Sequence, residues 1–313
     1  MCGITDHIFR TLCYEQGCDL AYTEMISATG YLCAPGQRAT NELLVRGKDE
    51  PRLFLQLFGR DPDTVAEAAR RICATGLYDG IDLNMGCPAR KIAPSGEGCG
   101  LMRTPETAFS MMKKTVAVSD IPVSVKMRIG YDGDHINVIE MARMAEDAGI
   151  ASITVHGRTR EQQYSGEADW DIIARVKESV RIPVCGNGDI FSAEQALTKQ
   201  AQSRADAVMI GRGAMGNPWI FREIKNLAVG RKIVRVSEAE KKNMVIRHYM
   251  MMLETRPERI AVREMRKHIG WYIKGMKGAA GFRAEINRCT DAREVLQMID
   301  GYFDNQPQPG EEI

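Results

Sequence analysis

Short runs of apolar and β-branched residues alternate with longer segments of helical periodicity, from near the start of the chain to about residue 230. This alternation restricts the fold more than any other feature, because strands separated by helical segments form a parallel sheet with helical crossovers. Seven strands over this length favour a (β/α)8 TIM barrel, an α/β fold, over an open sheet. The runs predict strands at residues 19–23, 52–58, 80–84, 123–127, 152–156, 183–187 and 207–211.

The first strand of such a barrel has no counterpart among these runs. Met1 is followed, after a short turn, by a helical pattern at residues 7–16. We expect that strand one is missing or truncated, or that the protein starts upstream of Met1. An open slot would leave unpaired edges on two neighbouring strands.

Several helix starts and ends are marked in the sequence. Asp61, Thr104 and Ser192 each stand where an N-cap residue precedes a first helical turn. At residues 135–149, apolar side chains recur on one side and Gly149 ends the pattern, which predicts an amphipathic helix.

The pattern changes after Gly230. Ser237 and Glu240 have the spacing of a capping box, and only helical patterns follow as far as residue 303, with breaks at 256–257 and 277–278. We predict a barrel domain at residues 1–232, an all-helical domain at 237–304 and a flexible tail at 305–313.

The composition excludes some classes of protein. The chain has 313 residues, of which 44% are hydrophobic, and a formal net charge of +1. No apolar run approaches the roughly 18 residues of a membrane helix, and no leader pattern opens the chain. The nine cysteines are scattered without zinc spacing, so we expect reduced thiols and no metal site. We predict a cytoplasmic protein, without membrane contact, that is a monomer.

Polar side chains stand at the ends of six consecutive predicted strands. In a barrel, the carboxyl ends of the strands meet on one face, where active sites are built. A single histidine or lysine there is more often structural or solvated, but six strands in register indicate a functional site. The residues are Gln56, Asn84 with Cys87, Lys126 with Arg128, His156 with Arg158, Asn187 with Asp189, and Arg212.

The last two predicted strands end in glycine-rich turns, at residues 186–189 and 211–213. Glycines let backbone N–H groups approach an anion, and barrels commonly bind phosphate with these two loops. Ordinary tight turns are the alternative, but Arg212 between two glycines favours phosphate. Lys126 and Gln56 across the rim suit the charge and polar edge of a flavin. Residues 211–216 have the spacing Gly-x-Gly-x-x-Gly, but no further strand follows to complete a nicotinamide-binding βαβ unit, so we predict FMN rather than tightly held NAD.

Cys87 follows a strand directly, in the turn Asn84-Met85-Gly86-Cys87-Pro88. A nucleophile would need a nearby base, and a metal ligand would need partners at metal spacing. A general acid needs only a protonated thiol, which is the usual state of cysteine at neutral pH. Beside a hydride source, such an acid suits the reduction of a polarised C=C bond, although a structural cysteine remains open.

With these residues in hand, the chain resembles the tRNA-dihydrouridine synthases, and most of all their bacterial B-type branch. The resemblance runs through nearly the whole chain. Its ordered motifs lie at residues 1–6, 84–88, 126–128, 156–160, 186–189, 210–213 and 218–221, with a helical part at 263–272.

The resemblance implies an FMN-dependent oxidoreductase that reduces specific uridines in tRNA to 5,6-dihydrouridine, with NADPH or NADH as electron donor. Hydride would pass from flavin N5 to uracil C6, and Cys87 would give the proton to C5. Asn84 and Arg128 would hold the uracil. FMN contacts would come from Met1, Gln56, Lys126, His156, Asn187, Gly188, Asp189, Gly211 and Arg212.

The chain departs from the family at its beginning. Family members carry a first strand that ends Ala-Pro-Met-Ala-Gly, whereas this sequence opens Met1-Cys2-Gly3. We expect the chain as given to bind FMN less well than one extended upstream.

Charge is divided unevenly within the helical part. Residues 237–288 hold 12 Lys and Arg against 6 Asp and Glu, whereas residues 289–313 hold 1 against 6. Arg263 and Lys267 lie on one side of a predicted helix, together with Arg259, Lys274 and Lys277. Such a side suits phosphate contacts with tRNA, although a solvated helix face is the alternative.

Two other functions remain open from the sequence. One is a flavin barrel that dehydrogenates a free small molecule of the orotate or pyrimidine type, which would not need the basic helical part. The other is an RNA-binding homologue with impaired catalysis.

Overall fold

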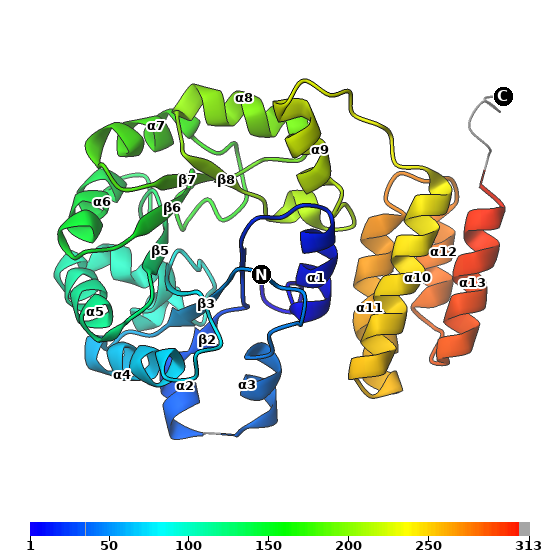
Figure 1. Ribbon diagram of the computed structural model, residues 1–313, viewed down its shortest axis with the longest axis horizontal. Coiled ribbons are helices and arrows are strands. Elements are labelled where there is room, and N and C mark those ends of the chain that lie inside the picture. The colour runs from blue at the N-terminus through cyan, green and yellow to red at the C-terminus, as the bar shows by residue number, and fades with distance from the viewer. Residues whose placement is uncertain (35, 307–313) are drawn as a thin grey trace.

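The computed structural model describes residues 1–34 and 36–306, and it contains one parallel sheet wrapped by helices (Figure 1). The sheet runs in the order β1, β3, β4, β5, β6, β7, β8, and β2 (Ile26–Ser27) also pairs with β3. The barrel-type α/β fold is therefore confirmed. The other strands are β1 (Ala21–Tyr22), β3 (Leu53–Phe58), β4 (Gly80–Met85), β5 (Val123–Arg128), β6 (Ser152–His156), β7 (Val184–Asn187) and β8 (Ala207–Met209).

The strands form because their side chains alternate between an apolar outer side and a largely polar inner side. On β3, Leu53, Leu55 and Leu57 are fully buried in the main hydrophobic core, whereas Gln56 is only partly buried and contacts Asp82 of β4. The outer side is covered by α4 (Pro62–Cys73), α5 (Pro105–Val118), α6 (Val138–Asp147), α7 (Trp170–Ser179) and α8 (Ala193–Ser203) (Figure 1).

The sheet does not close in the described part of the chain. Its order ends at β1 on one side and at β8 on the other, and no strand pairs with their outer edges among the described residues. The N-terminal turn lies beside these ends: Gly3 N–H and Ile4 N–H donate to Glu24, between β1 and β2, at 2.7 and 2.9 Å. The described chain thus has a barrel-type sheet without a first strand, as the sequence predicts.

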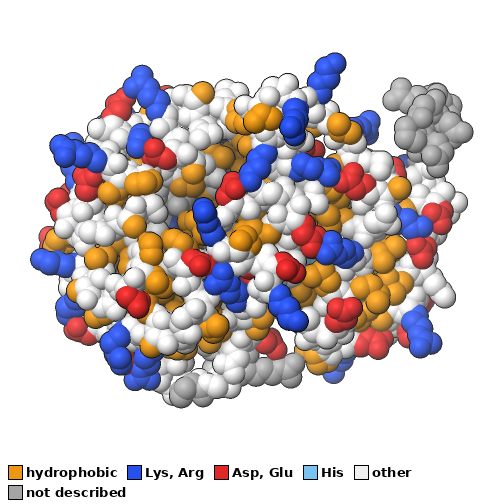
Figure 2. All heavy atoms as spheres, viewed as in Figure 1, with side chains coloured by type: hydrophobic (Ala, Val, Ile, Leu, Met, Phe, Trp, Pro, Cys, Tyr) orange, Lys and Arg blue, Asp and Glu red, His pale blue; other side chains and the backbone are white. Residues whose placement is uncertain are grey.

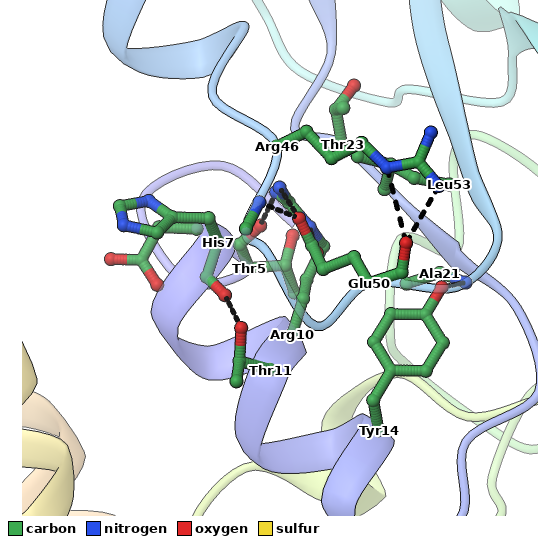
Figure 3. Close-up of polar contacts among 12 residues, drawn as sticks. Thr5, His7, Arg10, Thr11, Tyr14, Ala21, Thr23, Arg46, Glu50 and Leu53 are labelled. Atoms are coloured by element: carbon green, nitrogen blue, oxygen red, sulfur yellow. Dashed lines mark hydrogen bonds and ion pairs between the residues drawn. The ribbon is translucent and has the colours of Figure 1, made fainter. Parts of the chain in front are cut away.

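Helix α1 (His7–Glu15) is fastened to the segment before β3 by a buried ion pair (Figure 3). Arg10 donates to Glu50 at 2.5 Å, and their side chains are 4% and 0% exposed. Arg10 also donates to the carbonyls of Thr5 and Val45, so each charge is both paired and hydrogen-bonded. Such pairs cost stability when one partner is lost, because the other charge stays buried.

Three elements between β1 and β3 were not predicted from the sequence. These are β2, α2 (Ala28–Cys33) and α3 (Arg38–Leu43), all of them short. The helix expected at 135–149 begins only at Val138, because an isolated bridge between Gly130 and Ile136 closes a turn before it. Its predicted apolar stripe is buried, and Gly149 has a positive φ of 86°, as a helix-ending glycine does.

The C-terminal helices form a second core. They are α10 (Glu238–Thr255), α11 (Glu258–Tyr272), α12 (Ala279–Ile286) and α13 (Ala292–Asp304), and they follow α9 (Ile220–Ala228). The core also contains Ile8 and Leu12 of α1 and Trp219, so α1 packs against both parts of the molecule. Ser237 caps α10 by accepting from Glu240 N–H at 3.1 Å, as predicted. Of the tail predicted at 305–313, residues 307–313 lie outside the described part of the chain. In the described part, no helix is long and apolar enough to cross a bilayer.

Two buried histidines lie where α1 meets the C-terminal helices. The rings of His248 and His268 are 4.5 Å apart, and Phe9 of α1 stacks on His248 at 5.9 Å. His248 Nδ1 lies 3.3 Å from the Tyr272 hydroxyl. Burial lowers the pKa of His248 to about 4 and the pKa of His268 well below its usual value.

Acid should therefore weaken this junction. In the unfolded chain each histidine takes up a proton near pH 6.5, whereas in the folded chain the lowered pKa keeps it neutral. The contribution of these histidines to the free energy of unfolding is therefore fully present above pH 6.5 and is lost as pH falls toward 4. For His248 we expect a loss of about 2 kcal/mol between pH 7.5 and 5, measured as the free energy of unfolding in urea.

The variant His248→Gln should flatten this pH dependence, and His135→Gln, at an exposed position, should not. Equal pH slopes in the parent protein and His248→Gln would contradict the assignment.

Candidate active site

The polar residues predicted at the ends of the strands do lie together, at the carboxyl ends of the sheet. The parallel register pairs Asn84 with Lys126, Arg128 with His156, and His156 with Asn187 on neighbouring strands. Partners in register lie side by side in a parallel sheet, so the predicted groups form one polar layer at the mouth of the sheet.

The turn after β4 is held by the Asn84 side chain. Asn84 Oδ1 accepts from Gly86 N–H at 3.1 Å and from Cys87 N–H at 2.9 Å. The Cys87 carbonyl accepts from Cys99 N–H at 3.1 Å, which closes the loop from the other side. The Cys87 thiol is free, partly exposed and without a hydrogen-bond partner among the described residues. A partly exposed thiol on a fixed turn suits a proton donor.

Below this turn lies a buried carboxylate. Asp82 is fully buried and accepts from Gln56 Nε2 at 2.7 Å and from Ser124 Oγ at 2.6 Å. Burial raises the pKa of Asp82 to about 6, against the opposing effect of these two hydrogen bonds. No sequence pattern selects Asp82, because an aspartate inside a short strand has no motif of its own.

Lys126 of β5 places an ammonium group at the mouth of the sheet. No hydrogen bond or ion pair joins its ammonium group to any described residue, although the side chain is largely buried. Burial lowers the pKa of Lys126 to about 8; the Arg128 guanidinium contributes to this shift, and the Asp82 carboxylate opposes it. A buried ammonium without a partner costs stability, so its presence indicates an anionic or electron-rich ligand.

His156 is neutral in this setting. Burial lowers its pKa to about 2, with further contributions from the cations Lys126, Arg128, Arg158 and Arg212. Arg158 Nη1 lies 3.4 Å from His156 Nε2, and guanidinium only donates, so Nε2 accepts. The ring proton is then on Nδ1, which leaves a neutral hydrogen-bond donor at the mouth.

The Asp189 carboxylate is engaged in contacts within the protein. It forms a two-point ion pair with Arg158, at 2.9 and 2.6 Å, and it also binds Arg212 at 3.0 Å. Burial alone would raise the pKa of Asp189, but the bonds from Arg158 and from Ala168 N–H outweigh it and lower the pKa. The Asp189 carboxylate thus holds Arg212, whereas the Asp189 backbone N–H has no acceptor among the described residues. The predicted contact of Asp189 with a cofactor stays a prediction.

The two glycine-rich turns offer unpaired backbone donors. The N–H groups of Gly188, Asp189 and Gly211 reach no acceptor within the described ranges. Gly188 has a φ of 131°, and a Cβ there would lie 2.5 Å from that of Ala168, so only glycine fits. Arg212 joins the two turns through Asp189, and Met1 lies next to Gly211. Together they suit a phosphate group.

Arg128 mainly forms hydrogen bonds to backbone carbonyls. It is 2% exposed, and its guanidinium donates to the carbonyls of Gly86 at 2.9 Å, Thr159 at 2.7 Å and Gln163 at 3.0 Å. It thereby ties the Cys87 turn to the loop after β6. Its predicted contact with a substrate base stays a prediction.

Tyr164 was missed by the sequence analysis. It is 53% exposed on the loop after β6, with the Arg212 guanidinium 4.4 Å and the Arg128 guanidinium 5.9 Å from its ring centre. His156 lies 6.4 Å away, measured between rings. The loop places this ring over the mouth, but a tyrosine in a polar loop has no periodic pattern that would select it.

The two predicted tRNA contacts differ in the structure. Arg263 is exposed on α11 and has no partner in the described part of the chain. Lys267 instead donates to the Gly3 carbonyl, and burial lowers its pKa. The side chain of Lys267 thus holds the N-terminal turn, and its predicted phosphate contact stays a prediction. Figure 2 shows acidic side chains interspersed with basic ones over the viewed face of α10 and α11.

A family model described as Dihydrouridine synthase (Dus) matches residues 1–306. The chain belongs to the dihydrouridine synthase family. It is 38% identical to tRNA-dihydrouridine synthase B of Shewanella oneidensis, over 98% of this chain and 95% of that protein. It is also 38% identical to the synthase B of Pseudomonas aeruginosa, over 99% and 93% of the two chains. A probable tRNA-dihydrouridine synthase of Rickettsia conorii is 39% identical, over 97% and 91%.

The predicted resemblance to this family and to its B-type branch is thus confirmed, as is the prediction of an enzyme. Dihydrouridine synthases are oxidoreductases that act on tRNA, and they generally depend on a flavin. Among the described residues, no three His, Cys, Asp or Glu side chains gather as metal ligands would.

Replacing Lys126 with Met should stabilise the ligand-free protein. The variant removes a largely buried ammonium group for which the described residues provide no partner, and it keeps the volume of the side chain. We expect a gain of about 1–3 kcal/mol in the free energy of unfolding at neutral pH. The exposed Lys114→Met, whose partner is Asp63, is the control. A loss of stability in Lys126→Met would mean that Lys126 supports the fold rather than a ligand.

Proposed function

We propose that this enzyme reduces specific uridines of tRNA to 5,6-dihydrouridine, with FMN bound at the mouth of the sheet and NADPH or NADH as electron donor. Family membership and the names of the relatives support the reaction. Two groups at neighbouring strand ends support it most. One is the free thiol of Cys87, in the turn that Asn84 holds, and the other is the ammonium group of Lys126, the register partner of Asn84, which has no partner among the described residues.

The mouth fits FMN in both charge and polarity. Lys126 would face the electron-rich ring, and Gln56 with neutral His156 would meet its polar edge. The free N–H groups of Gly188, Asp189 and Gly211, with Arg212, would hold the phosphate. Met1 and Asn187 would border the same site. When bound, FMN supplies the hydride.

The residues of the chain then supply position and a proton. Asn84 holds the backbone of Cys87, so the thiol has a fixed place at the mouth. Cys87 Sγ would give its proton to uracil C5, and solvent would restore it. The base must leave its stack to reach this depth, which costs a few kcal/mol that binding elsewhere on the tRNA has to offset.

The helical part at 237–304 is proposed to bind the rest of the tRNA. Arg263 on α11 is exposed and free to contact phosphate. The rigid attachment of α10 and α11 to α1, through the shared core and the ion pair of Arg256 with Asp6 at 2.5 Å, would keep these contacts at a fixed distance from Cys87.

Cys87→Ala should abolish dihydrouridine formation while NADPH still bleaches the bound flavin. The thiol is the proposed proton donor, and loss of a general acid lowers a rate by about 10²–10⁴-fold. Turnover is measured by mass spectrometry of tRNA, and flavin reduction by its visible absorbance. Cys99→Ala, at the buried neighbouring thiol, should keep activity. Normal turnover in Cys87→Ala would rule out the proton-donor role.

Arg263→Ala should weaken tRNA binding and lower the dependence of log Kd on log salt by about one unit of slope, because one phosphate contact is lost. The matched control is Arg175→Ala, an equally exposed arginine on α7 of the barrel part. An unchanged slope in Arg263→Ala, or an equal change in both variants, would remove Arg263 from the tRNA-binding surface.

A further inference from the structure

A line of hydrogen bonds links the interior of the sheet to the Cys87 turn. It begins at Asp82, which is 0% exposed. One carboxylate oxygen accepts from Ser124 Oγ at 2.6 Å, and the other accepts from Gln56 Nε2 at 2.7 Å. These contacts join β3, β4 and β5 inside the sheet.

The line continues through two side-chain amides. Asn84 Nδ2 donates to Gln56 Oε1 at 2.8 Å. Asn84 Oδ1 then accepts from the N–H groups of Gly86 and Cys87. Asp82, Gln56 and Asn84 are called the amide relay below.

The relay has a direction, and the carboxylate sets it. A carboxylate can only accept, so Gln56 must turn its NH2 group toward Asp82 and its carbonyl toward Asn84. Asn84 must then turn its NH2 group toward Gln56, which leaves its carbonyl for the backbone of the turn. If either amide were reversed, donors would face donors in a buried place, at a cost of about 1–3 kcal/mol for each unsatisfied group.

We propose that Asp82 is a positioning residue, which fixes the Asn84 amide through Gln56 and so holds the turn that carries Cys87. The competing role for Asp82 is to balance the charge of Lys126. No ion pair within 4.0 Å joins these two groups, whereas the relay bonds are 2.6 to 2.8 Å long, so acceptance of hydrogen bonds is the stronger interaction. The importance of this turn for catalysis rests on the proposed function of Cys87.

Two substitutions separate hydrogen-bond acceptance from charge. Asp82→Leu removes both acceptors, and amide hydrogen exchange in the peptide with Gly86 and Cys87 should become about tenfold to a hundredfold faster, as expected for loss of a charged hydrogen bond. Asp82→Asn removes the charge but keeps an acceptor for Gln56, and its NH2 group can donate to Ser124 Oγ. Exchange in Asp82→Asn should stay close to that of the parent protein.

A second pair of variants reverses the relay. Asn84→Asp alone places carboxylates at both ends of Gln56, whose single NH2 group can satisfy only one of them, so the melting temperature should fall. In Asp82→Asn with Asn84→Asp, Gln56 can turn its NH2 group toward position 84 and accept from position 82. Every group is again satisfied, and the melting temperature should return toward that of the parent protein.

The control is Glu50→Gln, which weakens a buried ion pair with Arg10 in the segment before β3. It should lower the melting temperature without changing exchange at the turn.

Equal acceleration of exchange in Asp82→Asn and Asp82→Leu would overturn the proposal in favour of a charge role. A double variant no more stable than Asn84→Asp alone would also overturn it. If Asp82→Leu does not fold, the Asn84→Asp pair still decides. Amide exchange and melting temperature are measured without tRNA turnover. The positioning role of Asp82 can therefore be refuted while the function of Cys87 stands, and the function of Cys87 can be refuted while the role of Asp82 stands.

Discussion

The parallel register of β3 to β7 is the constraint on which the site depends. It places Gln56 beside Asp82, Asn84 beside Lys126, and Arg128 beside His156. Because side chains alternate along a strand, the apolar outer residues that bind the helices fix which residues face inward. A shift of one residue in any strand would bury its polar groups under a helix, so packing on the outside determines the chemistry of the inside.

Most of the fold could be predicted from the sequence, because long apolar runs separated by helical patterns leave few arrangements. The ends of β3, β4 and β6 differ from the prediction by one residue or none. The short elements β2, α2 and α3 were missed, since segments of two to six residues carry too little periodicity. The late start of α6 depends on the Gly130–Ile136 bridge, which only the folded chain forms.

The candidate site, like the fold, could be predicted from the sequence only in part. Its residues could be named from the sequence, because strand ends meet in a barrel, but their partners could not. Asp189 is used by Arg158, and Lys267 by the Gly3 carbonyl, through contacts 31 and 264 residues apart in the chain. Such pairings depend on side-chain direction in the finished fold. Lys126 is the opposite case: that its ammonium group has no partner among the described residues becomes visible only when its neighbours have been placed.

We propose that this chain makes dihydrouridine in tRNA. A direct test incubates the purified protein with FMN, NADPH and tRNA from cells that lack the gene, and then maps each uridine by mass spectrometry. We expect one or a few defined uridines to gain the mass of a pair of hydrogen atoms, and the same positions to carry this mass in cells with the gene. A reduced flavin with no change in any uridine would contradict this proposal.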